Sequence, residues 1–188
     1  MTLLGFALTL ALAASPEPVT VSGHTYAVTL PSGQTTLKLI GAGLRKKWFV
    51  DVYVLAAYTE SGRCSPQTII DAEEPKYLRI DMLRDVSAEK MASTIGEAFA
   101  AHMPADARPE LKAQRDAFLA SLREKLTTGT ALDFTYVPGQ GTVVRQNGRQ
   151  LGETLVGPAF AHVLWDIYLG PESCCKGTKE QILRSCRE

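Results

Sequence analysis

The segment from Trp48 to Tyr58 constrains the fold of this chain more than any other feature. It is rich in Val, Tyr, Phe and Trp, and Asp51 is its one charged residue. Side chains alternate between the two faces of a β-strand, and here both sets of alternate positions are largely apolar. A strand with two apolar faces has to be covered on both of them. We therefore expect a central strand with material packed on each side.

Alternating runs and turn signals elsewhere predict further strands and several amphipathic helices. Strands are predicted over Val19–Val21, Thr25–Leu30, Leu37–Ile40, Lys76–Arg84, Leu132–Val137 and Thr142–Gln146. Helices are predicted over 65–72, over 87–102 with Ser87 as the cap, after Pro109 and from Gly157 to Gly170. Asn147-Gly148 predicts a turn that leads into a further short strand. Strand-rich and helical stretches thus alternate along the chain, which predicts an α+β fold in which helices cover one face of an antiparallel sheet.

The N-terminus has the composition of an export signal. Residues 3–14 are almost wholly apolar, and Ala11-Leu12-Ala13 fits the A-x-A pattern for signal peptidase. The apolar run is too short to cross a bilayer as a helix. We therefore predict a signal peptide over residues 1–14, a folded domain over 15–188, a periplasmic or secreted location and no integral membrane segment after cleavage. No Lys or Arg precedes the apolar run, so a buried first strand or an interfacial anchor is the alternative interpretation.

Composition and charge exclude several functional classes. Twenty basic residues balance twenty acidic ones and lie among them along the chain, whereas nucleic-acid binders gather a basic excess on one face. No serine stands in a nucleophile motif, the three histidines are scattered, and no Cys or His spacing suits zinc. We therefore expect no nucleic-acid partner, no metal and no cofactor.

Four cysteines suit an oxidising compartment, in which an even number usually forms disulfides. They are Cys64, Cys174, Cys175 and Cys186. Cys174 and Cys175 are adjacent and lack the C-x-x-C spacing of a redox motif. We expect two structural disulfides, with Cys186 bonded to Cys174 or Cys175 and the other of these two bonded to Cys64, although sequence alone does not determine connectivity.

A glycine-containing basic segment, Gly41–Lys47, leads into the long strand. Its two glycines permit a tight bend or a close approach of backbones, and the planar guanidinium of Arg45 can bind a carboxylate with two parallel hydrogen bonds. An apolar strand beside it could accept an acyl chain or an aromatic body. The expected walls of that cleft are Trp48, Val50 and Tyr53. A surface turn with solvated charges is the alternative interpretation.

Several segments resemble the bacterial branch of the chalcone isomerase-like family. The run GAGLRKKWFVDVYVLAAY at 41–58 resembles the family's segment in which a G-A-G-x-R turn enters the long central strand. Leu83–Met91 resembles the start of the family's first long helix, and Gly157–Phe160 with Trp165–Gly170 resembles its closing helix. The resemblance implies the family's open-faced sandwich, a large antiparallel sheet with one layer of helices.

The resemblance also implies a ligand site. Some plant members close a chalcone ring and others hold a fatty acid, and in both the arginine that contacts the ligand matches Arg45. The threonine that the isomerases place at the start of the long strand falls at or beside Trp48, and no Ser or Thr lies between Lys46 and Tyr58. We therefore expect a non-catalytic binder of a lipophilic carboxylate, such as a fatty acid. The alternatives are a chalcone-type isomerase and a structural or partner-binding protein whose cleft is filled by its own side chains.

Overall fold

The computed structural model describes residues 17–186 of this chain. The predicted signal peptide, residues 1–14, lies outside the described residues.

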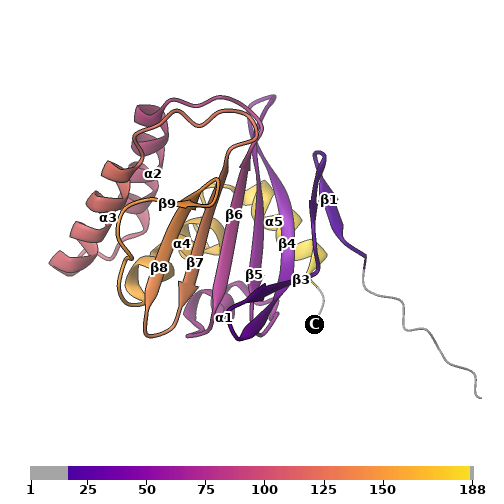
Figure 1. The fold of residues 1–188 in the computed structure, drawn as a ribbon, viewed down its shortest axis with the longest axis horizontal. Coiled ribbons are helices and arrows are strands. Elements are labelled where there is room, and N and C mark those ends of the chain that lie inside the picture. The colour runs from indigo at the N-terminus through magenta and orange to yellow at the C-terminus, as the bar shows by residue number, and fades with distance from the viewer. Residues whose placement is uncertain (1–16, 187–188) are drawn as a thin grey trace, which may run out of the picture.

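A seven-stranded antiparallel sheet forms the centre of the fold (Figure 1). Each strand pairs with the next one along the chain, so the sheet is a continuous meander. The strands are β3 (Thr29–Ser32), β4 (Thr35–Lys47), β5 (Val50–Thr59), β6 (Lys76–Met82), β7 (Ala131–Val137), β8 (Gly141–Gln146) and β9 (Arg149–Gln150). The predicted α+β class with an antiparallel sheet is confirmed.

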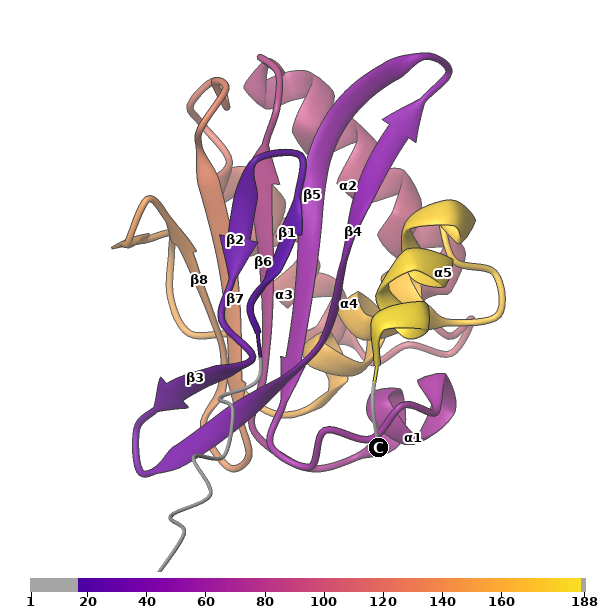
Figure 2. The same cartoon turned by 90° about the vertical axis from the view of Figure 1, so that its right-hand side faces the viewer.

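Five helices pack on one face of this sheet (Figures 1 and 2). They are α1 (Pro66–Asp71), α2 (Ala88–His102), α3 (Pro109–Ser121), α4 (Ala159–Leu169) and α5 (Lys176–Ser185). The predicted cap at Ser87 is present, since its side chain accepts a hydrogen bond from the backbone N–H of Lys90 at 3.2 Å. Phe99, Phe118 and Phe160 meet with ring centroids 5.0 to 6.2 Å apart. The main core therefore lies between the helices and the sheet.

A separate hairpin covers part of the opposite face of the sheet. It consists of β1 (Val19–Val21) and β2 (His24–Tyr26), and it lies in front of the central strands in Figure 2. Tyr26 packs there against a small cluster that includes Val54 and Tyr58, and its hydroxyl donates a hydrogen bond to Asp81 at 2.8 Å. The expectation that the long strand is covered on both faces is thus confirmed.

Two predicted boundaries near this strand are wrong. Gly41–Arg45 lies inside β4 and not in a turn, and β5 begins at Val50 and not at Trp48. Lys47 pairs with Val50, so Trp48 and Phe49 form a two-residue hairpin turn, and Trp48 has the left-handed backbone (φ +61°) that such turns use. The sequence pattern assigned Trp48 and Phe49 to the strand, because an apolar turn and an apolar strand show the same run of hydrophobic residues.

Candidate functional site

Helix α5, which the sequence did not predict, packs directly on the strand that carries Arg45. A Cβ at Gly43 would lie 2.5 Å from the carbonyl oxygen of Thr178, and one at Gly41 would overlap the carbonyl of Ile182. The backbone N–H of Leu44 also donates to the side-chain oxygen of Gln181 at 3.0 Å. Both glycines therefore serve the close backbone approach that was one of the two expectations for them. This contact fixes β4 immediately before Arg45.

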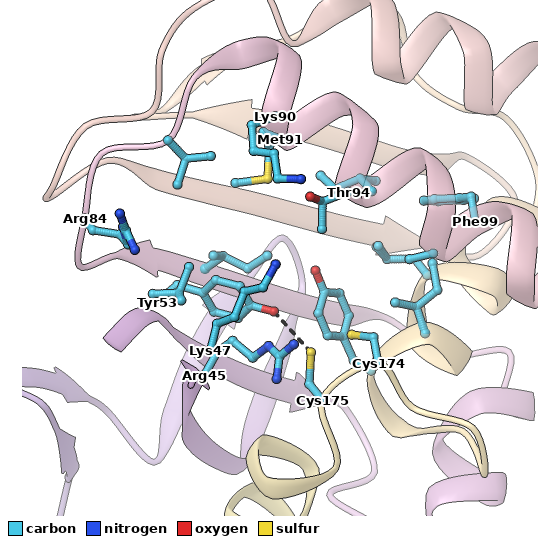
Figure 3. Close-up of a pocket in the computed structure, with 18 of the residues that line it drawn as sticks. Arg45, Lys47, Tyr53, Arg84, Lys90, Met91, Thr94, Phe99, Cys174 and Cys175 are labelled. Carbon is cyan, nitrogen blue, oxygen red and sulfur yellow. Dashed lines mark hydrogen bonds between the residues drawn. The ribbon is translucent and has the colours of Figure 1, made fainter. Parts of the chain in front are cut away.

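A cavity of about 430 Å³ opens between the sheet and helices α2 and α4 (Figure 3). This volume is within the range of small-molecule sites. Side chains of β6, β7, α2 and α4 make its interior apolar, among them Ile80, Ile95, Phe99, Phe134, Leu164 and Ile167. The alternative in which the protein's own side chains fill the cleft does not hold, because open volume remains beside Arg45.

Four cationic side chains line the exposed end of this cavity, and we call them the cationic rim: Arg45, Lys47, Arg84 and Lys90. Arg45 is half-buried, and its guanidinium donates one hydrogen bond to the carbonyl oxygen of Lys46 at 3.1 Å. The one carboxylate in the lining, Asp85, forms an ion pair with Lys125 at 2.6 Å. The rim therefore concentrates positive charge on a chain with no formal net charge.

A cluster of tyrosine and cysteine side chains lies beside Arg45 at the inner end of the rim (Figure 3). The Tyr53 hydroxyl and the Cys175 sulfur form a hydrogen bond at 3.4 Å. Burial raises the pKa of Tyr53 and of Tyr168 well above the ordinary value. A hydrogen bond from Cys174 lowers the pKa of Cys175 to about 7 although burial opposes this, and the same bond raises the pKa of Cys174. The cavity thus combines a cation, two neutral phenols and an acidic thiol.

The structure brings together only some of the residues that the sequence singled out. Arg45 and Tyr53 both line the cavity. Trp48 and Val50 do not, because Trp48 is in the β4–β5 turn with 85% of its surface exposed and Val50 follows the turn with 44% exposed. The expectation that Trp48 and Val50 wall the cleft is therefore wrong. Lys90, which also lines the cavity, was missed because an exposed helical lysine carries no sequence signal for a site.

The cysteine pairing differs from the expectation. Cys64 and Cys186 form a disulfide with 5.6 Å between their Cα atoms, and Cys174 and Cys175 are free thiols. The reason is α5, which begins after Cys175 and ends before Cys186. A helix of that length holds its ends on the order of 15 Å apart, too far for a disulfide. The prediction that Cys186 bonds to Cys174 or Cys175 is wrong.

Two further findings concern only residues 17–186. None of the helices there is long and apolar enough to cross a membrane. No group of three or more His, Cys, Asp or Glu side chains there could hold a metal ion.

A large antiparallel sheet covered on one face by helices is the fold that the sequence resemblance implied. A family model described as chalcone isomerase-like matches residues 18–184. This chain therefore belongs to the chalcone isomerase-like family.

A solved structure shares the fold. A fatty-acid binding protein of Arabidopsis thaliana aligns with a TM-score of 0.74 over 90% of this chain and 97% of its own. The two sequences are 16% identical, so the likeness establishes a common fold and not a common ligand. No curated protein sequence matches the chain significantly.

Proposed function

We propose that this chain is an exported bacterial protein that binds a lipophilic carboxylate, such as a fatty acid, without catalysing a reaction. The observation that carries the proposal is the cavity itself, which is apolar inside and has the cationic rim at its exposed end. An acyl chain is stabilised by removal from water, and a carboxylate is stabilised by a half-buried guanidinium. The ligand named for the structural neighbour from Arabidopsis is of the same chemical class.

Substitution of Arg45 tests this proposal most directly. Hydrogen bonds to charged groups contribute about 1.5–3 kcal/mol, so Arg45→Gln should weaken binding of a long-chain fatty acid by roughly 10- to 100-fold. Binding is measured by titration calorimetry and by native mass spectrometry. The matched control is Arg149→Gln, because Arg149 is exposed, pairs with Glu124 and does not line the cavity.

Two comparisons separate the carboxylate contact from the acyl contact. The wild-type protein should prefer the free acid to its methyl ester, and Arg45→Gln should abolish that preference. Ala98 is part of the cavity lining, so Ala98→Leu should reduce the volume of the cavity. It should therefore weaken the binding of long-chain fatty acids more than that of short-chain fatty acids. The proposal fails if no fatty acid binds the wild-type protein, or if Arg45→Gln and Arg149→Gln bind equally well.

The isomerase alternative has its own assay. A loss of chalcone absorbance that exceeds the spontaneous rate and disappears in Arg45→Gln would establish catalysis, since a cation that stabilises the enolate is the minimum the reaction needs. We expect the trace to follow the spontaneous rate.

Export is proposed from the N-terminal sequence. Expression of the full chain in a bacterium should yield a periplasmic protein that lacks the predicted signal peptide, with its mature N-terminus next to the Ala11-Leu12-Ala13 motif. A full-length protein that stays in the cytoplasm would contradict it.

A further inference from the structure

The β4–β5 turn exposes two large aromatic side chains to solvent. Trp48 is 85% exposed and Phe49 is 97% exposed. Val50 follows them with 44% exposed, and within residues 17–186 the one other exposed large hydrophobic residue is Val156. Figure 2 shows that this turn projects at one end of the sheet. Packing inside the fold does not account for aromatic residues at such a position, because neither side chain is buried by it.

Two basic residues lie next to these aromatics on one strand of the hairpin. Lys46 and Lys47 directly precede them, and the rest of the cationic rim continues along the neighbouring cavity opening. Lys46 is paired with Asp51 at 3.3 Å, but both side chains are substantially exposed, so Lys46 keeps access to solvent. An aromatic tip flanked by lysines has the composition that favours the interface of an anionic bilayer. Trp lies at headgroup level there, and each nearby Lys or Arg contributes about 1 kcal/mol.

The shape of the tip favours a bilayer over a protein partner. Stable protein interfaces bury about 800 Å² on each partner and are built around a packed central patch. A projecting two-residue turn is far smaller than such a patch, whereas insertion into the headgroup region requires only a few apolar side chains. The same argument disfavours contact with a second copy of this chain.

We propose that the segment Lys46–Val50 docks this protein on anionic phospholipid bilayers, with Trp48 and Phe49 inserted at the interface. Lys47 lines the cavity and is adjacent to Trp48, so docking brings the cavity opening close to the lipid surface. The docking surface goes beyond ligand binding and does not depend on it. The assay therefore contains no fatty acid and leaves Arg45 unchanged, so that the two proposals succeed or fail separately.

The two tryptophans of the chain make insertion directly measurable. Trp165 is 1% exposed, so the solvent-exposed component of the fluorescence belongs to Trp48. The full chain is mixed with vesicles of equal parts phosphatidylglycerol and phosphatidylcholine, and with vesicles of phosphatidylcholine alone. The difference between the wild-type protein and Trp48→Phe isolates the emission of Trp48. We expect that emission to shift to the blue, and its quenching by acrylamide to fall, with the anionic vesicles.

Cosedimentation with the same vesicles tests affinity. Trp48→Ser/Phe49→Ser should reduce the affinity for anionic vesicles by about tenfold or more, and Lys46→Gln/Lys47→Gln should remove most of the preference for phosphatidylglycerol. Val156→Ser, which removes an exposed apolar side chain elsewhere, should bind like the wild type. All these proteins share the apolar residues 3–14, so the difference between the variants, and not the absolute affinity of any one of them, reports on the tip.

Three results would overturn the proposal. The first is an emission from Trp48 that does not change with anionic vesicles. The second is equal cosedimentation of the wild-type protein and Trp48→Ser/Phe49→Ser. The third is a dimer in vesicle-free solution that this double variant dissociates, which would assign the tip to contact between copies of the chain.

Discussion

Cys175 shows how a single side chain acquires its chemistry from its neighbours. It is buried in the cavity wall, where an isolated thiol would be harder to ionise, yet the hydrogen bond from Cys174 lowers its pKa to about 7. The hydrogen bond with Tyr53 and the charge of Arg45 act in the same direction. Cys175 is therefore more acidic than an ordinary thiol, and it lies in the wall of a cavity that we propose to hold a lipophilic ligand.

The rate of alkylation of Cys175 tests this arrangement. Iodoacetamide reacts with the thiolate, so the rate should rise with pH to a midpoint near pH 7, below the value of about 8.5 for an ordinary thiol. Cys174→Ala removes the donor, and the midpoint should then move to higher pH. Peptide mass spectrometry identifies the modified residue, and Cys175→Ala provides the control for background reaction. Identical midpoints in the wild type and Cys174→Ala would contradict the assigned hydrogen bond.

At the scale of elements, α5 and β4 act as one unit. The glycines of β4 let the helix lie directly on the strand, and the Cys64–Cys186 disulfide holds the helix at its C-terminal end. Cys175 stands at the N-terminal end of the same helix. The packing of α5 therefore positions both Cys175 and the strand that carries Arg45.

The same substitution at two glycines tests this packing. Gly43→Ala places a Cβ 2.5 Å from the carbonyl oxygen of Thr178, so it should lower the free energy of unfolding by about 1–3 kcal/mol. Gly177→Ala lies in α5 with no atom within 4 Å of the added Cβ, and it should raise stability by about 0.4–1 kcal/mol. Urea denaturation followed by circular dichroism measures both. Equal effects at the two positions would show that α5 does not pack on Gly43.

At the scale of the whole molecule, burial affects every tyrosine. All six have a pKa above the ordinary value of about 10, and burial is the largest cause for each. The smallest shift raises the pKa of Tyr58 to about 12. In the folded protein these phenols keep their protons at a pH where the unfolded chain loses them. The stability they contribute is therefore fully present below pH 10 and is lost as the pH rises toward 12 and above.

Alkaline titration tests this expectation. Tyrosinate absorbance of the native protein should stay low near pH 10 and then rise together with the loss of circular dichroism. The same protein unfolded in guanidinium chloride should titrate near pH 10 and serves as the reference. Tyrosines that ionise near pH 10 while the circular dichroism is intact would contradict their burial.

Much of the fold was predictable because it follows from local patterns. Alternation of apolar residues predicted the central strand and its cover on both faces, and Ser87 predicted the start of α2. Asn147 and Gly148 predicted the turn before β9, where both residues have positive φ. The segment that suggested the family also contained Arg45, which does line the cavity.

The sequence by itself therefore determined the class of fold, the central strand and the cation of the candidate site, because each follows from the period or type of neighbouring residues. Only the tertiary structure decided that Trp48 lies in an exposed turn, that Cys64 bonds to Cys186, and that Cys175 faces Tyr53. These outcomes depend on which distant segments meet, above all on α5 packing against β4. The patterns of either segment alone do not contain that information, since a local period specifies the structure of a segment and not its partner.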